Sequence, residues 1–474
     1  MINKSLFDTL VPGAPLYRRT DTDQPVIENL EVRRDSGRLL KQRDLIPGLQ
    51  TPSLVSSYDG RIDQILLSIP EWAVEDPAMS DGYRSVIAAL RPDTRFVVVH
   101  SEGTAETVLA WFTDAGHPAD HVDLVALPNY VSFTVWAEDG YVALVDQADD
   151  STYLMEPWEF PRAGDALIAD AVSDSLPIRT QQAPLIFQGG NCLIGDTFWL
   201  LGRDYFADTL TVLSGQRPPV VQPDTVSLPD FATQLYSDYV ERERRLIIVG
   251  TTREIPLRSV RGLRLGDQYF LDVATDGAGT FQPIFHIDMF ITLLGTAPDG
   301  TFEVMVGDPS MADDILGTQS PWALADVYDA VARDLADEGF TVHRNPLVHW
   351  PTLTQTLSLA ELARIAGLPN NEELVPAVQE LRQAGAADDT EVSVRTWHHI
   401  TWNNCLVENS EQAGRQVYMP TFGYGDKASL ATIDDRMEEI WAERGFEVHR
   451  LADFNAFAER QGVVHCIKKY LKRT

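Results

Sequence analysis

Cysteine is scarce in this chain, with only Cys192, Cys405 and Cys466 among 474 residues. Three scattered thiols are too few for a disulfide framework, and they are not spaced as the ligands of a zinc site. Their scarcity is typical of a reducing compartment, so we expect a cytoplasmic protein. Long apolar runs are missing as well: Met1–Phe7 lacks the core of a signal peptide, and no run approaches the roughly 20 apolar residues that span a bilayer.

Basic side chains are also in short supply. The sequence has 38 lysines and arginines against 70 aspartates and glutamates, a formal net charge of -32. Nucleic acids and anionic membrane surfaces bind basic patches, so we expect neither as a partner. The acidity favours a cationic ligand, although it also keeps a protein soluble without any part in binding. The glycine-rich fingerprint of dinucleotide sites and the lysine of phosphate-binding loops are missing too, and we predict neither a cofactor nor a metal ion.

Apolar periodicity indicates alternating strands and helices from residue 62 onward, beginning with the buried strand Ile65–Ile69. Two helix-to-strand joints are nearly identical, Gly339-Phe340-Thr341-Val342-His343-Arg344 and Gly445-Phe446-Glu447-Val448-His449-Arg450. This repeat indicates a duplicated strand-helix-strand unit, and about five such units can be counted. The predicted fold class is therefore α/β, although a doubly wound sheet shows the same alternation.

Two segments differ from this pattern. Residues 1–60 are rich in Pro, Asp, Arg and Thr without a sustained period, which predicts an extended N-terminal arm before one domain over residues 61–474. Residues 353–388 are expected to be a wholly helical insertion. It opens with the capping box Ser358-Leu359-Ala360-Glu361.

A candidate nucleophile lies near the C-terminus, in Gly462-Val463-Val464-His465-Cys466. Taken alone, Cys466 also fits a small buried apolar residue. His465 is a poor catalytic partner if this segment is a strand, because neighbours on a strand point to opposite faces. His286 is a better candidate, since Phe285-His286-Ile287-Asp288 places an imidazole and a carboxylate on one face of a strand predicted over 284–294. In isolation, this pair also fits a hydrogen-bonded core histidine.

Two carboxylates, Asp139 and Asp288, are set where burial is expected. A buried carboxylate needs a cation or hydrogen-bond donors, and neither has an arginine nearby in the sequence. Two carboxylates that converge on one pocket would suit a guanidinium, which binds carboxylates through forked hydrogen bonds. Glu138-Asp139 alone also fits a turn before the strand predicted over 141–145.

Two further segments carry weaker signals. Gln188-Gly189-Gly190-Asn191 indicates a tight bend or a close backbone approach. Asn403-Asn404 either presents amides to the same site or turns the chain.

The ordered set of these motifs resembles the guanidino-group-modifying enzymes of the pentein superfamily, which include the arginine, agmatine and peptidyl-arginine deiminases. The motifs are Trp136-Ala137-Glu138-Asp139, Phe187-Gln188-Gly189-Gly190-Asn191, Phe285-His286-Ile287-Asp288 and Gly462-Val463-Val464-His465-Cys466. Residues 403–423 are similar to a stretch that these enzymes carry before the cysteine, and the likeness covers about residues 60–474. It implies a five-bladed α/β propeller with pseudo-fivefold repeats of strand-helix-strand units.

The resemblance also implies roles for individual residues. Cys466 would be the nucleophile, His286 the general acid and base, and Asp139 and Asp288 the clamp for the guanidinium. The substrate site would further include Trp136, Gln188, Asn191 and Asn404. The implied activity is hydrolysis of a C–N bond in a small cationic guanidino compound or an arginine side chain, through a covalent thiouronium intermediate, to a ureido product and ammonia. A homo-oligomer is compatible with this family.

One departure from the family pattern is Gln188, where many of these enzymes have a glutamate. A neutral amide orients an imidazole but stabilises its charged form less well than a carboxylate does. The peptidyl-arginine branch depends less on that glutamate, so Gln188 favours it over the free-arginine and agmatine branches. No calcium-binding loop is evident in the sequence, however. Gly202-Arg203-Asp204-Tyr205-Phe206 is similar to amidinotransferases, so transfer of the amidino group to an amine is an alternative. A non-catalytic binding pentein is a third hypothesis, although such proteins lack the cysteine and the histidine-aspartate pair.

Overall fold

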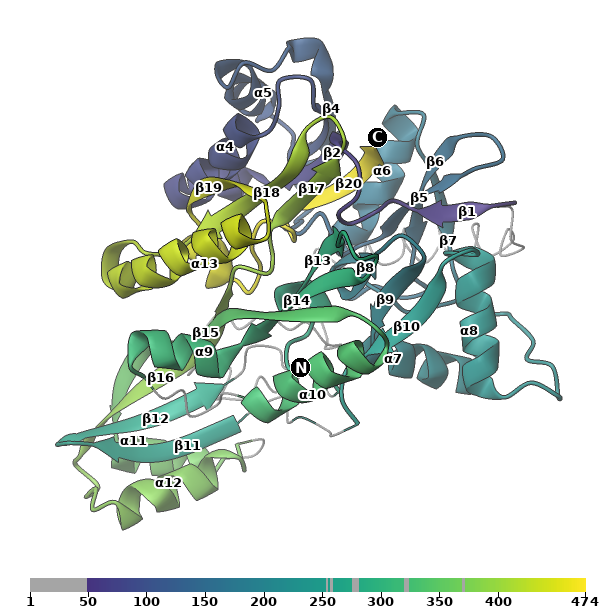
Figure 1. Ribbon diagram of the computed structural model, residues 1–474. Coiled ribbons are helices and arrows are strands. Elements are labelled where there is room, and N and C mark those ends of the chain that lie inside the picture. Colours follow the sequence, from purple (N-terminus) through teal and green to yellow (C-terminus); the bar gives the residue numbers. More distant parts are fainter. Residues whose placement is uncertain (1–48, 253–254, 256–258, 275–280, 319–323, 369–370) are drawn as a thin grey trace.

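The computed structural model describes residues 49–252, 255, 259–274, 281–318, 324–368 and 371–474. Within these residues the strands form five sheets, and helices pack against them (Figure 1). The C-terminal strand β20 (Lys468–Arg473) pairs with β2 (Ile62–Ile69), so the last strand of the chain completes a sheet that begins near residue 62. The predicted α/β class is confirmed.

Every sheet contains the same core of three strands: an antiparallel pair and a parallel neighbour that the chain reaches through a helix. In one sheet, β8 (Cys192–Ile194) is antiparallel to β9 (Phe198–Gly202), and β9 is parallel to β10 (Arg245–Val249). The same plan recurs in β13 (Ile291–Thr296), β14 (Phe302–Asp308) and β15 (Thr341–Ser358); in β17 (Leu406–Ser410), β18 (Gly414–Thr421) and β19 (Glu447–Asp453); in β5 (Val142–Asp146), β6 (Ser151–Glu156) and β7 (Arg179–Gln182); and in β20, β2 and β3 (Arg95–Ser101).

Further elements extend this plan. Two strands widen sheets at their edges, β1 (Pro52–Leu54) beside β5 and β4 (Val122–Leu127) beside β3. The connecting helices are α4 (Pro77–Ala89), α5 (Ala105–Asp114), α6 (Ile168–Ser175), α7 (Arg203–Ser214), α8 (Leu228–Tyr239), α9 (Pro309–Leu316), α10 (Ala325–Asp337) and α13 (Ala431–Glu443). Of the described helices, none is long and apolar enough to cross a membrane.

The two nearly identical joints occupy equivalent places. Gly339 and Gly445 end α10 and α13 with φ of 96° and 77°, in the left-handed region that favours glycine. The strands that follow, β15 and β19, each lie parallel to the middle strand of their sheet. The duplicated unit predicted from these joints is therefore confirmed.

The insertion is only partly helical, so this prediction was wrong in part. Its first residues, 353–358, belong to β15, because their threonine-rich sequence continues the pairing with β16 (Glu391–Thr401). The helices α11 (Leu359–Ala366) and α12 (Leu374–Gln383) follow, and the predicted capping box of Ser358 and Glu361 is present. Together with β11 (Ser259–Leu265) and β12 (Gln268–Ala274), these elements form an accessory lobe with its own apolar core.

The N-terminal arm cannot be compared over residues 1–48, which lie outside the described residues. The strand predicted over 284–294 begins only at Ile291, and a short 3-10 turn occupies Ile287–Met289. His286 and Asp288 therefore do not share a strand face, and their convergence has another cause.

Candidate active site

The residues predicted to form the site share one position in the repeat, directly before its first strand. Asp139 precedes β5, Gln188 precedes β8, His286 and Asp288 precede β13, Asn404 precedes β17, and Cys466 precedes β20. Because equivalent strand ends of the five sheets meet, residues far apart in the sequence gather at one place. Each of these residues is at most 2% exposed.

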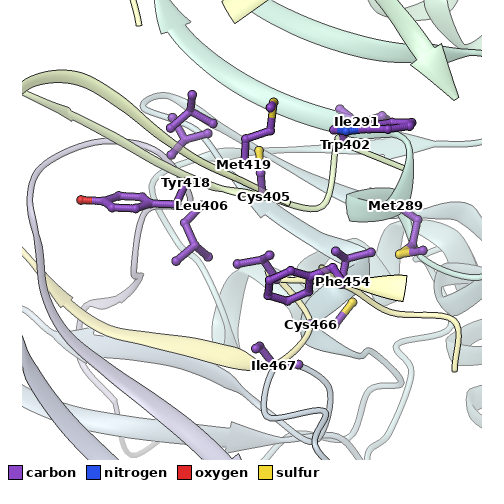
Figure 2. Packing of buried hydrophobic residues seen from close by; sticks show 14 of the residues in the cluster. Met289, Ile291, Trp402, Cys405, Leu406, Tyr418, Met419, Phe454, Cys466 and Ile467 are labelled. Carbon is purple, nitrogen blue, oxygen red and sulfur yellow. The ribbon is translucent and has the colours of Figure 1, made fainter. Parts of the chain in front are cut away.

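Cys466 belongs to the large apolar cluster that also contains Phe454 and Ile467 (Figure 2). Its polar neighbours are the side-chain nitrogen of Asn404, 3.1 Å from Sγ, and Oδ2 of Asp288, 3.8 Å from Sγ. Burial raises the pKa of the Cys466 thiol well above its ordinary value, and the negative charges of Asp288 and Asp139 raise it further. A cation bound beside this sulfur would oppose both effects.

The imidazole of His286 is held by Gln188, a residue predicted to bind substrate, because Nε2 lies 2.9 Å from Oε1 of Gln188. The hydroxyl of Tyr205 is 3.4 Å from the same nitrogen, and the other ring nitrogen, Nδ1, is 3.6 Å from Oδ1 of Asp139. An amide oxygen only accepts hydrogen bonds, so Nε2 carries the proton of the neutral ring. Burial lowers the pKa of His286 to about 3.

Gly190 lets the imidazole and a carboxylate approach each other. A Cβ atom at this position would lie 2.5 Å from Nδ1 of His286 and 3.2 Å from Oδ2 of Asp288. Any side chain here would displace one of them, so the close backbone approach predicted for the paired glycines is confirmed.

The two carboxylates differ in their partners. Oδ2 of Asp139 accepts a hydrogen bond from Nη2 of Arg162 at 2.6 Å, whereas Oδ2 of Asp288 is hydrogen-bonded to Nδ1 of His465 at 2.8 Å. The other oxygen of each, Oδ1, is buried and has no hydrogen-bond partner among the described residues. Burial raises the pKa of both carboxyl groups.

His465 lies next to Asp288. We had predicted that it would point away from the site, because neighbours on a strand face opposite sides. Residues 464–467 form a turn and not a strand, so the alternation of faces does not apply. Burial lowers the pKa of His465 well below its ordinary value, and Nδ1 of the ring lies 2.8 Å from Oδ2 of Asp288.

Three charged residues of the site had no clear signal in the sequence. Arg162 follows Asp139 by 23 residues and reaches it from the segment after β6. Lys468 and Lys469 follow the cysteine, and both bind the carboxylate of Glu138, at 2.9 and 2.6 Å. Two lysines at the start of a buried strand were the available hint.

Two of the predicted substrate-binding residues have supporting positions. Asn191 exchanges side-chain hydrogen bonds with Gln282, and its Oδ1 accepts the backbone N–H of Ile287, so it holds the segment that carries His286. Trp136 packs against the nucleophile turn, where a Cβ atom at Gly462 would lie 2.3 Å from its ring. The two other thiols, Cys192 and Cys405, are buried, and burial raises the pKa of each.

Comparison with known proteins finds the same architecture in solved structures. No family model and no curated protein matches this sequence. An agmatine deiminase of Enterococcus faecalis superposes with a TM-score of 0.51 at 13% identity, covering 91% of this chain and 98% of that chain. The C. jejuni agmatine deiminase gives 0.50 at 10% identity, covering 90% and 98%. At this identity the likeness establishes the fold, and the α/β pentein fold predicted from the resemblance is confirmed.

Proposed function

From the pentein fold of this chain and the chemistry of its buried site, we propose that the protein hydrolyses a guanidino group to a ureido group and ammonia. The observation that carries the proposal is the pair of buried oxygens, Oδ1 of Asp139 and Oδ1 of Asp288, that lack a hydrogen-bond partner within the described part of the chain. Buried carboxylate oxygens of this kind are costly unless a donor reaches them. A guanidinium offers planar, charged donors to both.

The charge of the site supports a cationic ligand. Arg162, Lys468 and Lys469 are balanced by Glu138, Asp139 and Asp165, which are their ion-pair partners. Asp288 has no such cation among the described residues, because its partner is a neutral imidazole. One bound guanidinium would therefore neutralise the remaining negative charge.

The proposed reaction begins when the bound guanidinium lowers the pKa of Cys466. The thiol proton passes to His286, and the sulfur forms a bond with the guanidinium carbon, which gives a tetrahedral adduct. His286 then donates its proton to the departing nitrogen, the C–N bond breaks, and ammonia leaves a thiouronium on the sulfur. Water adds to the same carbon after losing a proton to His286, and cleavage of the C–S bond releases the ureido product and the thiol.

Because Gln188 is neutral, the imidazolium of His286 in this scheme must be stabilised by another residue. The Gln188 amide holds Nε2 of His286 but supplies no negative charge to the imidazolium, and burial already disfavours that form. We therefore propose that the imidazolium forms only briefly, next to Asp139, whose Oδ1 lies 3.6 Å from Nδ1.

The substrates that fit are small guanidino compounds, with agmatine the first choice because the proteins with the same fold include agmatine deiminases. Peptidyl arginine is the second choice, because Gln188 in place of the family glutamate favours the peptidyl-arginine branch. Amidino transfer to an amine stays open, since Tyr205 of the amidinotransferase-like segment lies 3.4 Å from His286.

The test is a panel of agmatine, free arginine, methylated arginines and an arginine peptide, scored for ureido product and for ammonia. We expect equal amounts of both from at least one compound, none with Cys466→Ala, and unchanged turnover with Cys405→Ala as the matched control. Ureido product and ammonia from Cys466→Ala would contradict the assignment of the nucleophile. Loss of the amidino group without ammonia, only when an amine is added, would favour transfer. No product from any compound would favour a binding protein.

A further inference from the structure

The two carboxylates of the site have unequal surroundings. Asp139 has a permanent cation, the guanidinium of Arg162, at 2.6 Å. Asp288 is bonded to the neutral ring of His465 and lies 3.8 Å from the neutral thiol of Cys466. A buried carboxyl group stays ionised only if charge or donors stabilise the anion, so this difference separates their protonation behaviour.

Arg162 is itself held in place by a second carboxylate, that of Asp165. Its Nε donates to Oδ2 of Asp165 at 2.6 Å. Asp165 is buried and anchored in turn by the backbone N–H and the hydroxyl of Thr134, each at 2.6 Å. The ring of Phe160 covers the guanidinium, with 5.0 Å between Cζ and the ring centroid. The position of Arg162 is therefore fixed independently of any ligand.

We propose that Arg162 is a positioning residue that keeps Asp139 ionised and aimed at the ligand, so that Asp139 is the fixed anion of the clamp. Asp288 has no such cation among the described residues, and the bound guanidinium supplies one. This inference deepens the proposed function and rests on it for the identity of the ligand. The proposal predicts that the wild-type site prefers a cationic ligand over a wide pH range. A variant without Arg162 should show this preference only at higher pH.

The groups that face Asp139 come from four segments. Arg162 and Asp165 come from the segment after β6, His286 and Asp288 from the segment before β13, Lys469 from β20, and Glu138 from the same loop. Lys469 lowers the pKa of Asp139, but its ammonium is bound to Glu138. Arg162 provides the larger opposition to burial and the direct hydrogen bond.

The test compares two alkylating reagents on the full chain. Chloroacetamidine carries a planar cation, whereas iodoacetamide is neutral, and both react with the same thiolate. We take the ratio of the second-order rate constant for chloroacetamidine to that for iodoacetamide at Cys466. The thiolate fraction enters both rate constants and drops out of this ratio, which therefore reports the charge of the carboxylates. It needs no turnover.

We expect the wild-type ratio to stay high from about pH 6 to about pH 8. In Arg162→Gln it falls by about tenfold at the lower pH and recovers as the pH rises and Asp139 ionises without help. Arg162→Lys retains most of the preference. The matched control is Arg179→Gln, which removes an exposed arginine paired with Asp149 and leaves the ratio unchanged.

A ratio in Arg162→Gln equal to that of the wild type at every pH would overturn the inference, as would a wild type without preference for the cation. If circular dichroism shows that Arg162→Gln does not fold, Asp165→Asn replaces it in the test. This variant removes the ion pair that holds Arg162 and should lower the ratio at acidic pH. A protein that prefers the cationic reagent but produces no ureido compound would refute the hydrolysis and not the role of Arg162.

Discussion

The side-chain nitrogen of Asn404 lies 3.1 Å from the sulfur of Cys466, and the oxygen of the same amide accepts the backbone N–H groups of His465 and Cys466, at 2.9 and 3.2 Å. One side chain thus supplies a donor to the nucleophile and holds the turn that carries it. This hydrogen bond lowers the pKa of the thiol and so opposes burial.

Asn404→Ala should therefore raise the pKa of Cys466 and lower kcat by a factor of about 10² to 10³, the range for loss of one preorganised donor. The pH dependence of alkylation by iodoacetamide measures the thiol directly. Asn404→Asp should shift this profile to still higher pH, because it replaces a donor with a negative charge. An alkylation profile unchanged in both variants would show that the amide does not act on the sulfur.

Gln188→Glu places a carboxylate where the amide oxygen now lies, 2.9 Å from Nε2 of His286. A negative charge at this distance stabilises the imidazolium, so the pKa of His286 should rise from its present value of about 3. Because the proposed reaction needs the imidazolium to protonate the leaving nitrogen, we expect kcat to increase by about tenfold at neutral pH. Gln188→Leu, which neither orients nor charges the ring, is the matched comparison and should lose activity; a gain there would refute the argument.

The sequence allowed candidate site residues to be named, but not the side chains that pair with them. Cys466, His286, Asp288 and Asp139 were identified because each lies in a short motif, and motifs are local. Their meeting depends on five sheets placing equivalent strand ends together. The partnership of Arg162 with Asp139 and that of Glu138 with two lysines depend on the same assembly, so local patterns did not reveal them.

The errors have a common physical origin. Strand alternation was applied to His465 and to the segment 285–288, yet His465 lies in a turn and residues 287–289 form a 3-10 turn, so the two-residue period of a strand does not apply to either. Residues 353–358 were predicted as part of a helical insertion, but their threonine-rich sequence favours a strand and pairs with β16, and the capping box starts the helix only after Ser358. The repeat itself was predictable because helix ends carry glycine and amphipathic faces have a fixed period.

Replacing the two carboxylates should change stability in opposite directions. Burial raises the folded-state pKa of Asp288, so its contribution to stability is complete below about pH 4 and is lost as the pH rises through the folded value. Asp288→Asn removes this loss and should raise the free energy of unfolding by at least about 1 kcal/mol at pH 8, while it abolishes turnover.

Asp139→Asn should instead lower the free energy of unfolding by about 1–3 kcal/mol, because it removes one of the two carboxylates bound to Arg162. Urea unfolding of both variants at about pH 5 and pH 8 measures the contrast, since the gain from Asp288→Asn should shrink at the lower pH. A loss of stability in both variants would contradict the assigned charge states.

The carboxylate of Glu138 ties β20 to the loop that carries Asp139. It accepts hydrogen bonds from Lys468 and Lys469, and all three residues are at most 5% exposed. The backbone N–H of Glu138 also donates to the carbonyl of Cys466, at 3.1 Å. Glu138→Gln leaves two buried ammonium groups without an anion and should lower the free energy of unfolding by about 3–5 kcal/mol.

The pH dependence of this loss distinguishes charge from packing. Burial lowers the pKa of Lys468 to about 8, so between that value and its unfolded value the unfolded chain binds more protons, and stability rises with pH. In Glu138→Gln this pKa should fall further, and the deficit relative to the wild type should be smaller at about pH 9.5 than at pH 7. Combining Glu138→Gln with Lys469→Met should recover part of the loss, because one ammonium is removed and Lys468 can deprotonate. A deficit that is constant with pH and additive in the double variant would mean that the three residues only fill space, and that β20 is held to the site by other contacts.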